Sequence, residues 1–139
     1  MRIRASRELL APIDDVWSFV SEPYNLPNWW PRLGGVQPDR RGLERGARWL
    51  VTGQETPSLA RKGAATAQLL VTEVEPPRRL AFRLLEEKLD AELTLAPLPN
   101  DRTHATLDVK ARWLLGPGRS VATEALSRLH ALCQTGAEP

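Results

Sequence analysis

The sequence predicts an α+β fold in which a curved antiparallel sheet of roughly seven strands packs against a long C-terminal helix. Three patterns lead to this expectation. Residues 2–9 alternate between polar and apolar side chains, which is typical of a strand. Further strand-like runs lie between residues 35 and 114, separated by glycine, proline and asparagine residues. Residues 118–134 then carry apolar side chains at helical spacing.

A short amphipathic helix is expected over residues 13–21, directly after the first strand. Pro12 stands at its start, where a missing backbone N–H is tolerated, and Asp14 and Asp15 lie in the first turn, where carboxylates complement the helix dipole. The apolar residues at helical spacing are Ile13, Val16, Trp17 and Val20. The proline-rich segment 21–31 leaves room for one short helical turn.

The strands of the predicted sheet cover residues 2–9, 35–40, 46–53, 65–75, 79–86, 89–97 and 103–114. The segments that divide them are short, so consecutive strands should pair antiparallel as hairpins. From Ala105 to Trp113 every second side chain is apolar, and the residues between them are polar. One face of the sheet is therefore expected to be wet and the other covered.

The helix expected over residues 118–134 would span about 25 Å, enough to cross several strands. Its apolar stripe consists of Val121, Ala122, Ala125, Leu126, Leu129, Leu132 and Cys133. Gly136 is the expected stop signal. One helix does not fill the concave side of a strongly twisted sheet, so this arrangement allows a cavity between helix and sheet.

Composition narrows the class of protein. A chain of 139 residues suits a single domain, and 42% hydrophobic with 26% charged residues is ordinary for a globular protein. The single cysteine, Cys133, excludes an internal disulfide and is expected to be a buried, unreactive thiol. No apolar run approaches a membrane span, and the first residues lack the apolar core of a signal peptide. We therefore expect a soluble, cytoplasmic domain over residues 1–139, with no cofactor and no metal.

The net charge of +2 is too small to predict nucleic-acid binding, and basic and acidic residues are interspersed. The densest basic cluster consists of Arg40, Arg41, Arg45 and Arg48, interrupted by Glu44. It has two interpretations, a phosphate site or a solvated loop, and the second is the simpler one.

Several motifs follow one another in a recognisable order. Leu9-Leu10-Ala11-Pro12 precedes Val16-Trp17, a proline-rich turn runs from Glu22 to Pro31, and hairpin-like segments cover residues 71–83 and 95–106. Over nearly the whole chain this order resembles the START-like superfamily, also called SRPBCC, and within it the small proteins of polyketide cyclase/dehydrase type. The resemblance implies a helix-grip fold, in which the sheet wraps around the C-terminal helix with a hydrophobic pocket between them.

The resemblance implies less about chemistry than about fold. Members of the superfamily bind lipids, sterols, hormones or aromatic polyketides, and some catalyse cyclisation or dehydration. The superfamily has no universal catalytic motif, so no residue of this chain inherits a catalytic role.

A ligand in such a pocket would contact the apolar inner face and the tryptophan rings, which suit aromatic ligands as well as cores. Trp29 and Trp30 share one short turn, so one ring is expected to fill the core and the other to approach the pocket mouth. Leu59 lies at the tip of the segment 52–63, which is either a lid or a surface loop. The cavity-lining candidates are Trp29, Trp30, Trp49, Leu59, Phe82, Leu84, Leu93, Leu107, Val109, Trp113, Val121, Ala125 and Leu129.

Polar groups able to act inside the pocket are few. Tyr24 is expected at a solvent edge, His104 on the polar face of its strand, and His130 at the edge of the helix stripe. Arg7 falls on the apolar side of its strand, and Glu73 is a second candidate for an inward position. Because a buried charge is costly unless it is paired, either would be a functional lead if it were enclosed.

Three functions are compatible with these observations. The leading hypothesis is a domain that binds a hydrophobic or aromatic small molecule in the cavity. The alternative is a cyclase or dehydratase acting on a polyketide-like substrate, which needs an enclosed acid or base. The third is a protein-interaction module with a filled pocket and an exposed apolar patch. In each case we expect no nucleic acid, no membrane insertion, and a monomer or weak homodimer.

Overall fold

The computed structural model describes residues 2–53, 66–111 and 120–137. Its elements confirm the α+β prediction, with one antiparallel sheet and a long C-terminal helix. In chain order they are β1 (Arg2–Leu9), α1 (Ile13–Val20), η1 (Pro23–Asn25), α2 (Leu26–Trp29), β2 (Leu33–Gln37), β3 (Arg48–Gly53), β4 (Thr66–Glu75), β5 (Arg79–Leu84), β6 (Leu89–Leu98), β7 (Arg102–Ala111) and α3 (Val121–Ala137).

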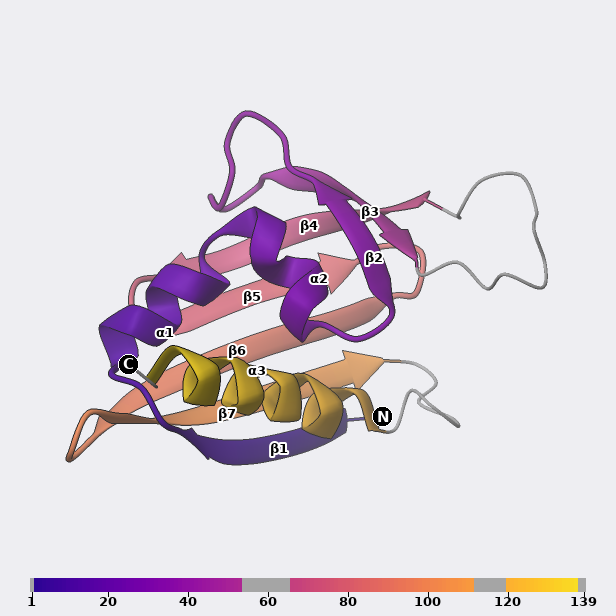
Figure 1. The fold of residues 1–139 in the computed structure, drawn as a ribbon. Helices are drawn as coiled ribbons and strands as arrows, with labels where there is room; N and C mark the ends of the chain where they lie inside the picture. Colours follow the sequence, from indigo (N-terminus) through magenta and orange to yellow (C-terminus); the bar gives the residue numbers. More distant parts are fainter. Residues whose placement is uncertain (1, 54–65, 112–119, 138–139) are drawn as a thin grey trace.

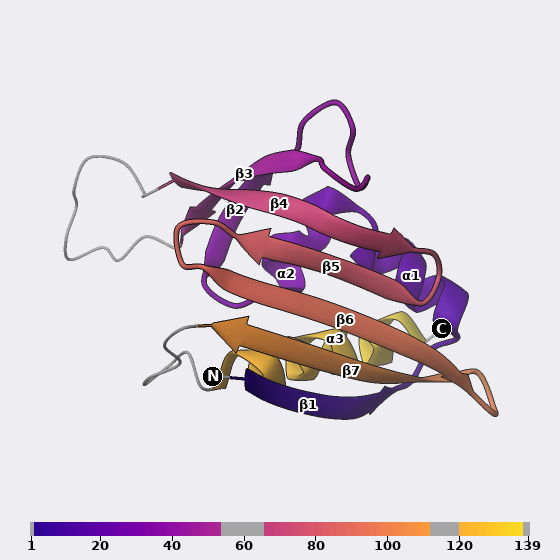
Figure 2. The same cartoon turned by 180° about the vertical axis from the view of Figure 1, so that it is seen from behind.

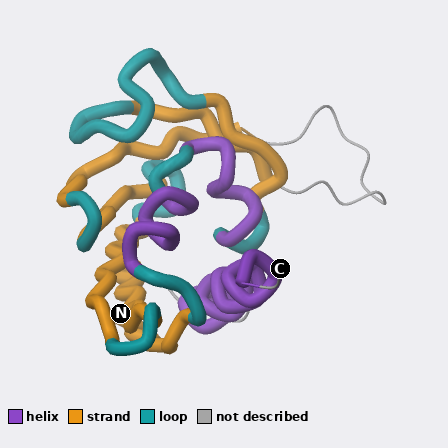
Figure 3. The backbone as a smooth tube through the Cα atoms, turned by 60° about the vertical axis from the view of Figure 1, so that its left-hand side comes forward, coloured by secondary structure: helices purple, strands orange, loops and turns teal. Residues whose placement is uncertain are grey.

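The described strands form a seven-stranded sheet in the order β1-β7-β6-β5-β4-β3-β2, and every neighbouring pair is antiparallel. The first strand thus forms one edge of the sheet, beside the last strand. Helices α1, α2 and α3 all lie on one side, across which the strands curve (Figure 1). The opposite side carries no described helix (Figure 2). The helices and the sheet thus form two layers (Figure 3). The buried hydrophobic side chains form the core between these layers.

The predicted alternation is confirmed in the central strands. Leu80, Phe82 and Leu84 of β5 are buried, and on β7 the positions from Thr103 to Ala111 alternate between buried and accessible. The outer face carries ion pairs instead. Asp108 of β7 lies 3.3 Å from the Nε atom of Arg2 and 2.8 Å from that of Arg4. Alternation along each strand therefore separates a dry inner face from a charged outer face.

Helix α1 begins as the sequence predicts. Pro12 is its N-cap, with an extended backbone, and Asp14 and Asp15 occupy the first turn. Val16 and Val20 are buried against the core. The side-chain amide of Asn25 donates a 3.0 Å hydrogen bond to the carbonyl of Phe19 and so fixes the chain after α1.

Most boundaries agree with the prediction to within two residues, and the ends of β2 and α3 differ more. Strand β2 ends at Gln37 instead of residue 40, because Pro38 follows and has no N–H for the ladder. Helix α3 covers Val121–Ala137, so it runs through Gly136, while the predicted start at residue 118 lies outside the described residues. A single glycine in a helix costs only about 1 kcal/mol relative to alanine, so Gly136 does not have to end it.

Candidate functional site

An apolar groove lies between α1 and the C-terminal half of α3. Its volume is about 280 Å³, and its lining residues are Leu10, Ala11, Pro12, Asp15, Val16, Phe19, Leu129, Leu132 and Cys133. We call it the α1–α3 groove. Leu132 is 36% exposed, so the groove presents apolar surface to solvent. Asp15 is the lining residue that carries a charge.

A buried hydroxyl group positions one wall of the groove. Thr103 of β7 is fully buried, and its Oγ1 atom donates a 2.7 Å hydrogen bond to the carbonyl oxygen of Ala11. Thr103 also pairs with Leu9 in the ladder between β1 and β7. The connection from β1 to α1 is therefore tied to the sheet at the point where it enters the groove.

Cys133 and Asp15 are the groups of the groove that can change their protonation state. Burial raises the pKa of the Cys133 thiol, and the nearby charge of Asp15 raises it further. The thiol is therefore protonated at neutral pH, which makes it a poor nucleophile. Cys133 is half-buried, less enclosed than the sequence predicted.

A smaller recess lies at the opposite end of α3, beside its first turn. Its volume is about 70 Å³, and its lining residues are Trp30, Pro31, Arg32, Leu33, Leu84, Glu87, Leu89 and Val121. We call it the Trp30 pocket. The α1–α3 groove and the Trp30 pocket thus flank the two ends of the helix, with the apolar core between them.

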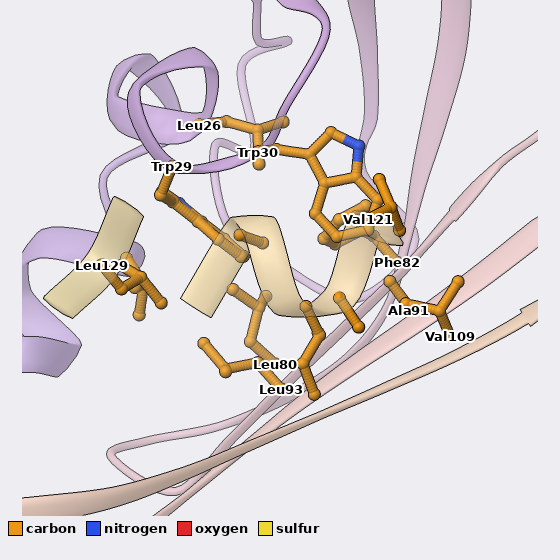
Figure 4. Close-up of a cluster of buried hydrophobic side chains, with 14 of the residues drawn as sticks. Leu26, Trp29, Trp30, Leu80, Phe82, Ala91, Leu93, Val109, Val121 and Leu129 are labelled. Atoms are coloured by element: carbon orange, nitrogen blue, oxygen red, sulfur yellow. The ribbon is translucent and has the colours of Figure 1, made fainter. Parts of the chain in front are cut away.

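Both tryptophans of the α2 turn face inward, so the expectation that only one would do so is wrong. Trp29 is 0% and Trp30 is 2% exposed. Their rings meet edge to face with centroids 6.0 Å apart, and Trp30 meets Phe82 in the same way at 5.1 Å. Trp30 is the C-cap of α2 and has an extended backbone, with ψ 123°, so the two side chains do not follow helical spacing (Figure 4).

The predicted cavity-lining residues separate into four groups. Leu129 lines the α1–α3 groove, and Trp30, Leu84 and Val121 line the Trp30 pocket. Leu59 and Trp113 lie outside the described residues. The remainder are buried in the core between the two recesses, namely Trp29, Trp49, Phe82, Leu93, Leu107, Val109 and Ala125. That any of these residues contacts a ligand stays a prediction.

Sequence reasoning missed most of the α1–α3 groove. Leu10 and Phe19 are apolar residues that fall outside the predicted stripes, and this is the signal that could have indicated a second apolar surface. The helical spacing predicts Leu132 on the buried stripe of the helix, but Leu132 lies at the edge of that stripe, facing α1.

The polar candidates lie away from the interior. Tyr24 is 65% exposed, and His104 is exposed on the outer face. Arg7 occupies an inner-face position of β1, at the edge of the sheet, where it is exposed and its Nη1 atom donates a 3.3 Å hydrogen bond to the hydroxyl oxygen of Ser127. Glu73 is not inward, because a β-bulge between Val71 and Glu73 shifts the register of β4 by one residue.

Glu73 instead joins the ion pairs of the outer face. Its carboxylate lies 3.5 Å from Arg79 and 3.9 Å from Arg45.

None of the helices in the described ranges is long and apolar enough to cross a membrane. Within the same ranges, no group of three or more His, Cys, Asp or Glu side chains is placed to hold a metal ion.

Residues of the arginine cluster make hydrogen bonds within the loop between β2 and β3 and at the start of β3. Asp39 accepts hydrogen bonds from the backbone N–H groups of Arg48, at 3.0 Å, and Arg41, at 2.9 Å. These bonds, that of Arg48 above all, hold the pKa of Asp39 below its usual range. The Arg41 side chain donates to the carbonyl of Gly46 at 3.3 Å. These contacts favour the solvated-loop interpretation over a phosphate site.

Comparison with known families agrees with the geometry. The family model described as "Polyketide cyclase / dehydrase and lipid transport" matches residues 1–135. This match confirms the resemblance to the START-like superfamily. No curated protein sequence matches the chain.

Solved structures share the fold over the whole chain. An AHSA1-like protein from Aeromonas hydrophila gives a TM-score of 0.74 at 19% identity, covering 98% of this chain and 94% of that one. A protein from Nitrosomonas europaea gives 0.73 at 18% identity, covering 98% and 96%. The di-domain ARO/CYC BexL of the BE-7585A biosynthetic pathway gives 0.72 at 19% identity, covering 100% of this chain and 48% of that one. At such identities the likeness establishes the helix-grip fold alone.

Proposed function

Because the chain belongs to the polyketide cyclase/dehydrase and lipid transport family, we propose that it binds a hydrophobic or aromatic small molecule on the inner side of α3. The observation that carries this proposal is the α1–α3 groove, an apolar opening of about 280 Å³ that adjoins the apolar core under the helix. Apolar surface removed from water contributes about 25 cal/mol per Å², so such a groove favours apolar ligands.

The size of the groove limits what it holds. Small-molecule pockets span roughly 300 to 1,000 Å³, so this groove suits a small ring system or one segment of a longer chain. A ligand that passes Leu129 into the interior, whether a small ring system or part of a longer chain, would displace side chains of the core. The residues it would then meet are the predicted cavity-lining residues of the inner face.

Binding without turnover is the better supported form of this function. A cyclase or dehydratase would need an acid or base facing the ligand. Of the polar candidates, Arg7, Tyr24 and His104 are exposed outside the interior, and Glu73 lies on the outer face. The titratable groups that line the groove are Asp15, which is exposed to solvent, and Cys133, whose raised pKa keeps its thiol protonated. The name of BexL favours the enzyme alternative, since it describes an ARO/CYC protein of a biosynthetic pathway.

Cys133 supplies a direct test, because it is the chain's single cysteine and it lines the groove. A ligand in the groove should slow alkylation of the thiol. A panel of sterols, fatty acids and aromatic polyketides should include at least one such ligand. At about 100 times its dissociation constant, the ligand should also raise the melting temperature by on the order of 10 °C.

Two matched variants locate the binding. Leu132→Gln, on the rim of the groove, should weaken protection of Cys133. Leu50→Gln should not, because Leu50 is an exposed leucine on the outer face, 46% accessible. A folded protein that shows neither protection nor a thermal shift with any member of the panel would overturn the proposal and would favour a protein partner.

A further inference from the structure

The interior under α3 holds a hydrogen-bond donor that has no acceptor. Trp29 is fully buried, and its indole Nε1 finds no hydrogen-bond partner among the described residues. Native proteins pair the great majority of their buried polar groups, so such a donor calls for an explanation. Trp49 shows the usual solution, since its Nε1 donates a 2.7 Å hydrogen bond to the carbonyl of Gly42.

The surroundings of Trp29 are apolar. Its ring extends from α2 toward α3 and the sheet, among Leu26, Leu129 and Leu80 (Figure 4). The buried polar side chain of the described core is Thr103, and its hydroxyl hydrogen is already donated to Ala11. Arg79 Nε is the other unbonded buried atom of the described residues, but it faces Glu75 and Glu92 on the outer side of the sheet. Among the fully buried side-chain atoms of the described interior, the indole N–H of Trp29 is therefore the donor without an acceptor.

We propose that Trp29 determines which ligands the interior accepts, by donating its indole hydrogen to a neutral oxygen of an otherwise apolar molecule. This inference rests on the proposed binding function and gives the ligand's chemical class: a ketone, ester or ether attached to a ring system or chain. A pure hydrocarbon would leave the N–H unpaired. A carboxylate would lose its hydration for a single neutral donor, which is unfavourable.

Three probes with the same ring system test this class directly: naphthalene, 2-acetylnaphthalene and 2-naphthoate. The wild-type protein should bind the ketone about tenfold more tightly than the hydrocarbon, the value of one ordinary hydrogen bond, and more tightly than the carboxylate. In Trp29→Phe, which keeps an apolar ring and removes the N–H, the ratio of ketone to hydrocarbon affinity should fall to about one.

Trp17→Phe is the matched control, because it makes the same substitution at a half-buried tryptophan of α1 whose indole nitrogen is not among the buried atoms without a partner. It should keep the wild-type ratio. A second readout uses ¹⁵N-labelled wild-type protein, in which the indole N–H signal of Trp29 should move downfield when the ketone binds. Nuclear Overhauser contacts with methyl groups of the surrounding core cluster assign that signal if Trp29→Phe does not fold.

The outcomes separate this inference from the function on which it rests. The inference is overturned, and the binding function left intact, if folded Trp29→Phe keeps the wild-type ratio of ketone to hydrocarbon affinity. The same holds if the indole N–H of Trp29 is already hydrogen-bonded to buried water and its signal does not move when the ketone binds. Preference for the hydrocarbon or the carboxylate in the wild type has the same consequence. If none of these probes and no member of the broader panel binds, both proposals fail.

Discussion

The indole nitrogen of Trp49 donates a 2.7 Å hydrogen bond to the carbonyl oxygen of Gly42, and this bond ties the loop between β2 and β3 to the sheet. Gly42 has φ 61°, in the left-handed region that glycine adopts most readily. Trp49 is buried on the inner face of β3. The side chain of Trp49 thus holds the loop between β2 and β3 at Gly42, where no ladder hydrogen bond of the described strands does so.

Trp49→Phe should destabilise the protein by about 1 to 3 kcal/mol beyond the loss of packing, because it removes the donor from a part-buried carbonyl. Urea unfolding at neutral pH measures the change. Trp29→Phe is the reference, since its indole makes no hydrogen bond within the described protein. Equal losses of unfolding free energy in the two variants would contradict the proposal that the Trp49 hydrogen bond stabilises the protein.

Thr103→Val should lower the free energy of unfolding by about 1 to 3 kcal/mol, because the hydrogen bond to the part-buried carbonyl of Ala11 is lost while the side-chain shape is kept. It should also speed alkylation of Cys133, since the groove wall is released. Thr106→Val is the control, because the Thr106 hydroxyl bonds Ser6 on the outer face. The prediction fails if the two variants have the same stability and the same alkylation rate.

Cys133 should react with iodoacetamide more slowly at neutral pH than an unshielded thiol does, because its raised pKa leaves little thiolate. Asp15→Asn removes a negative charge that opposes ionisation, so it should shift the alkylation profile toward lower pH. The rate measured between about pH 7 and 10 reports the shift. A profile that moves the other way, or stays in place, would exclude the electrostatic contact.

Asp108 should make stability fall in acid. Hydrogen bonding to Arg4 in the first place holds the pKa of this carboxyl below its ordinary value. A carboxyl whose pKa is lower in the folded than in the unfolded state stabilises the protein at pH values above its unfolded-state pKa. This stabilisation is lost as the pH falls through the folded-state pKa, here below about pH 4. Asp108→Asn should therefore destabilise the protein at pH 7 and have a smaller effect near pH 2.

The control for Asp108 is Asp90→Asn. Asp90 lies 3.8 Å from Arg83, with about half of its side chain exposed, and such surface pairs contribute little. Urea unfolding of both variants and the wild type at the two pH values completes the test. A pH-independent difference between Asp108→Asn and the wild type would contradict the linkage.

Local periodicity in the sequence determined the elements and most of the core. The alternation of Leu107 and Val109 with polar neighbours fixed which face of β7 is dry, since side chains on a strand alternate regardless of what they pack against. Pro12 and the two aspartates that follow it fixed the start of α1 for an equally local reason. Family membership followed from the order of the same local motifs.

Only the tertiary structure decided what those faces meet. A bulge in β4 turned Glu73 outward, although strict alternation allowed an inward position. The extended backbone at Trp30 turned its ring inward beside Trp29. The α1–α3 groove joins Phe19 to Leu132, residues from the two ends of the chain. Periodicity carries no information about register shifts or about which distant segments meet, because long-range pairing and packing fix both.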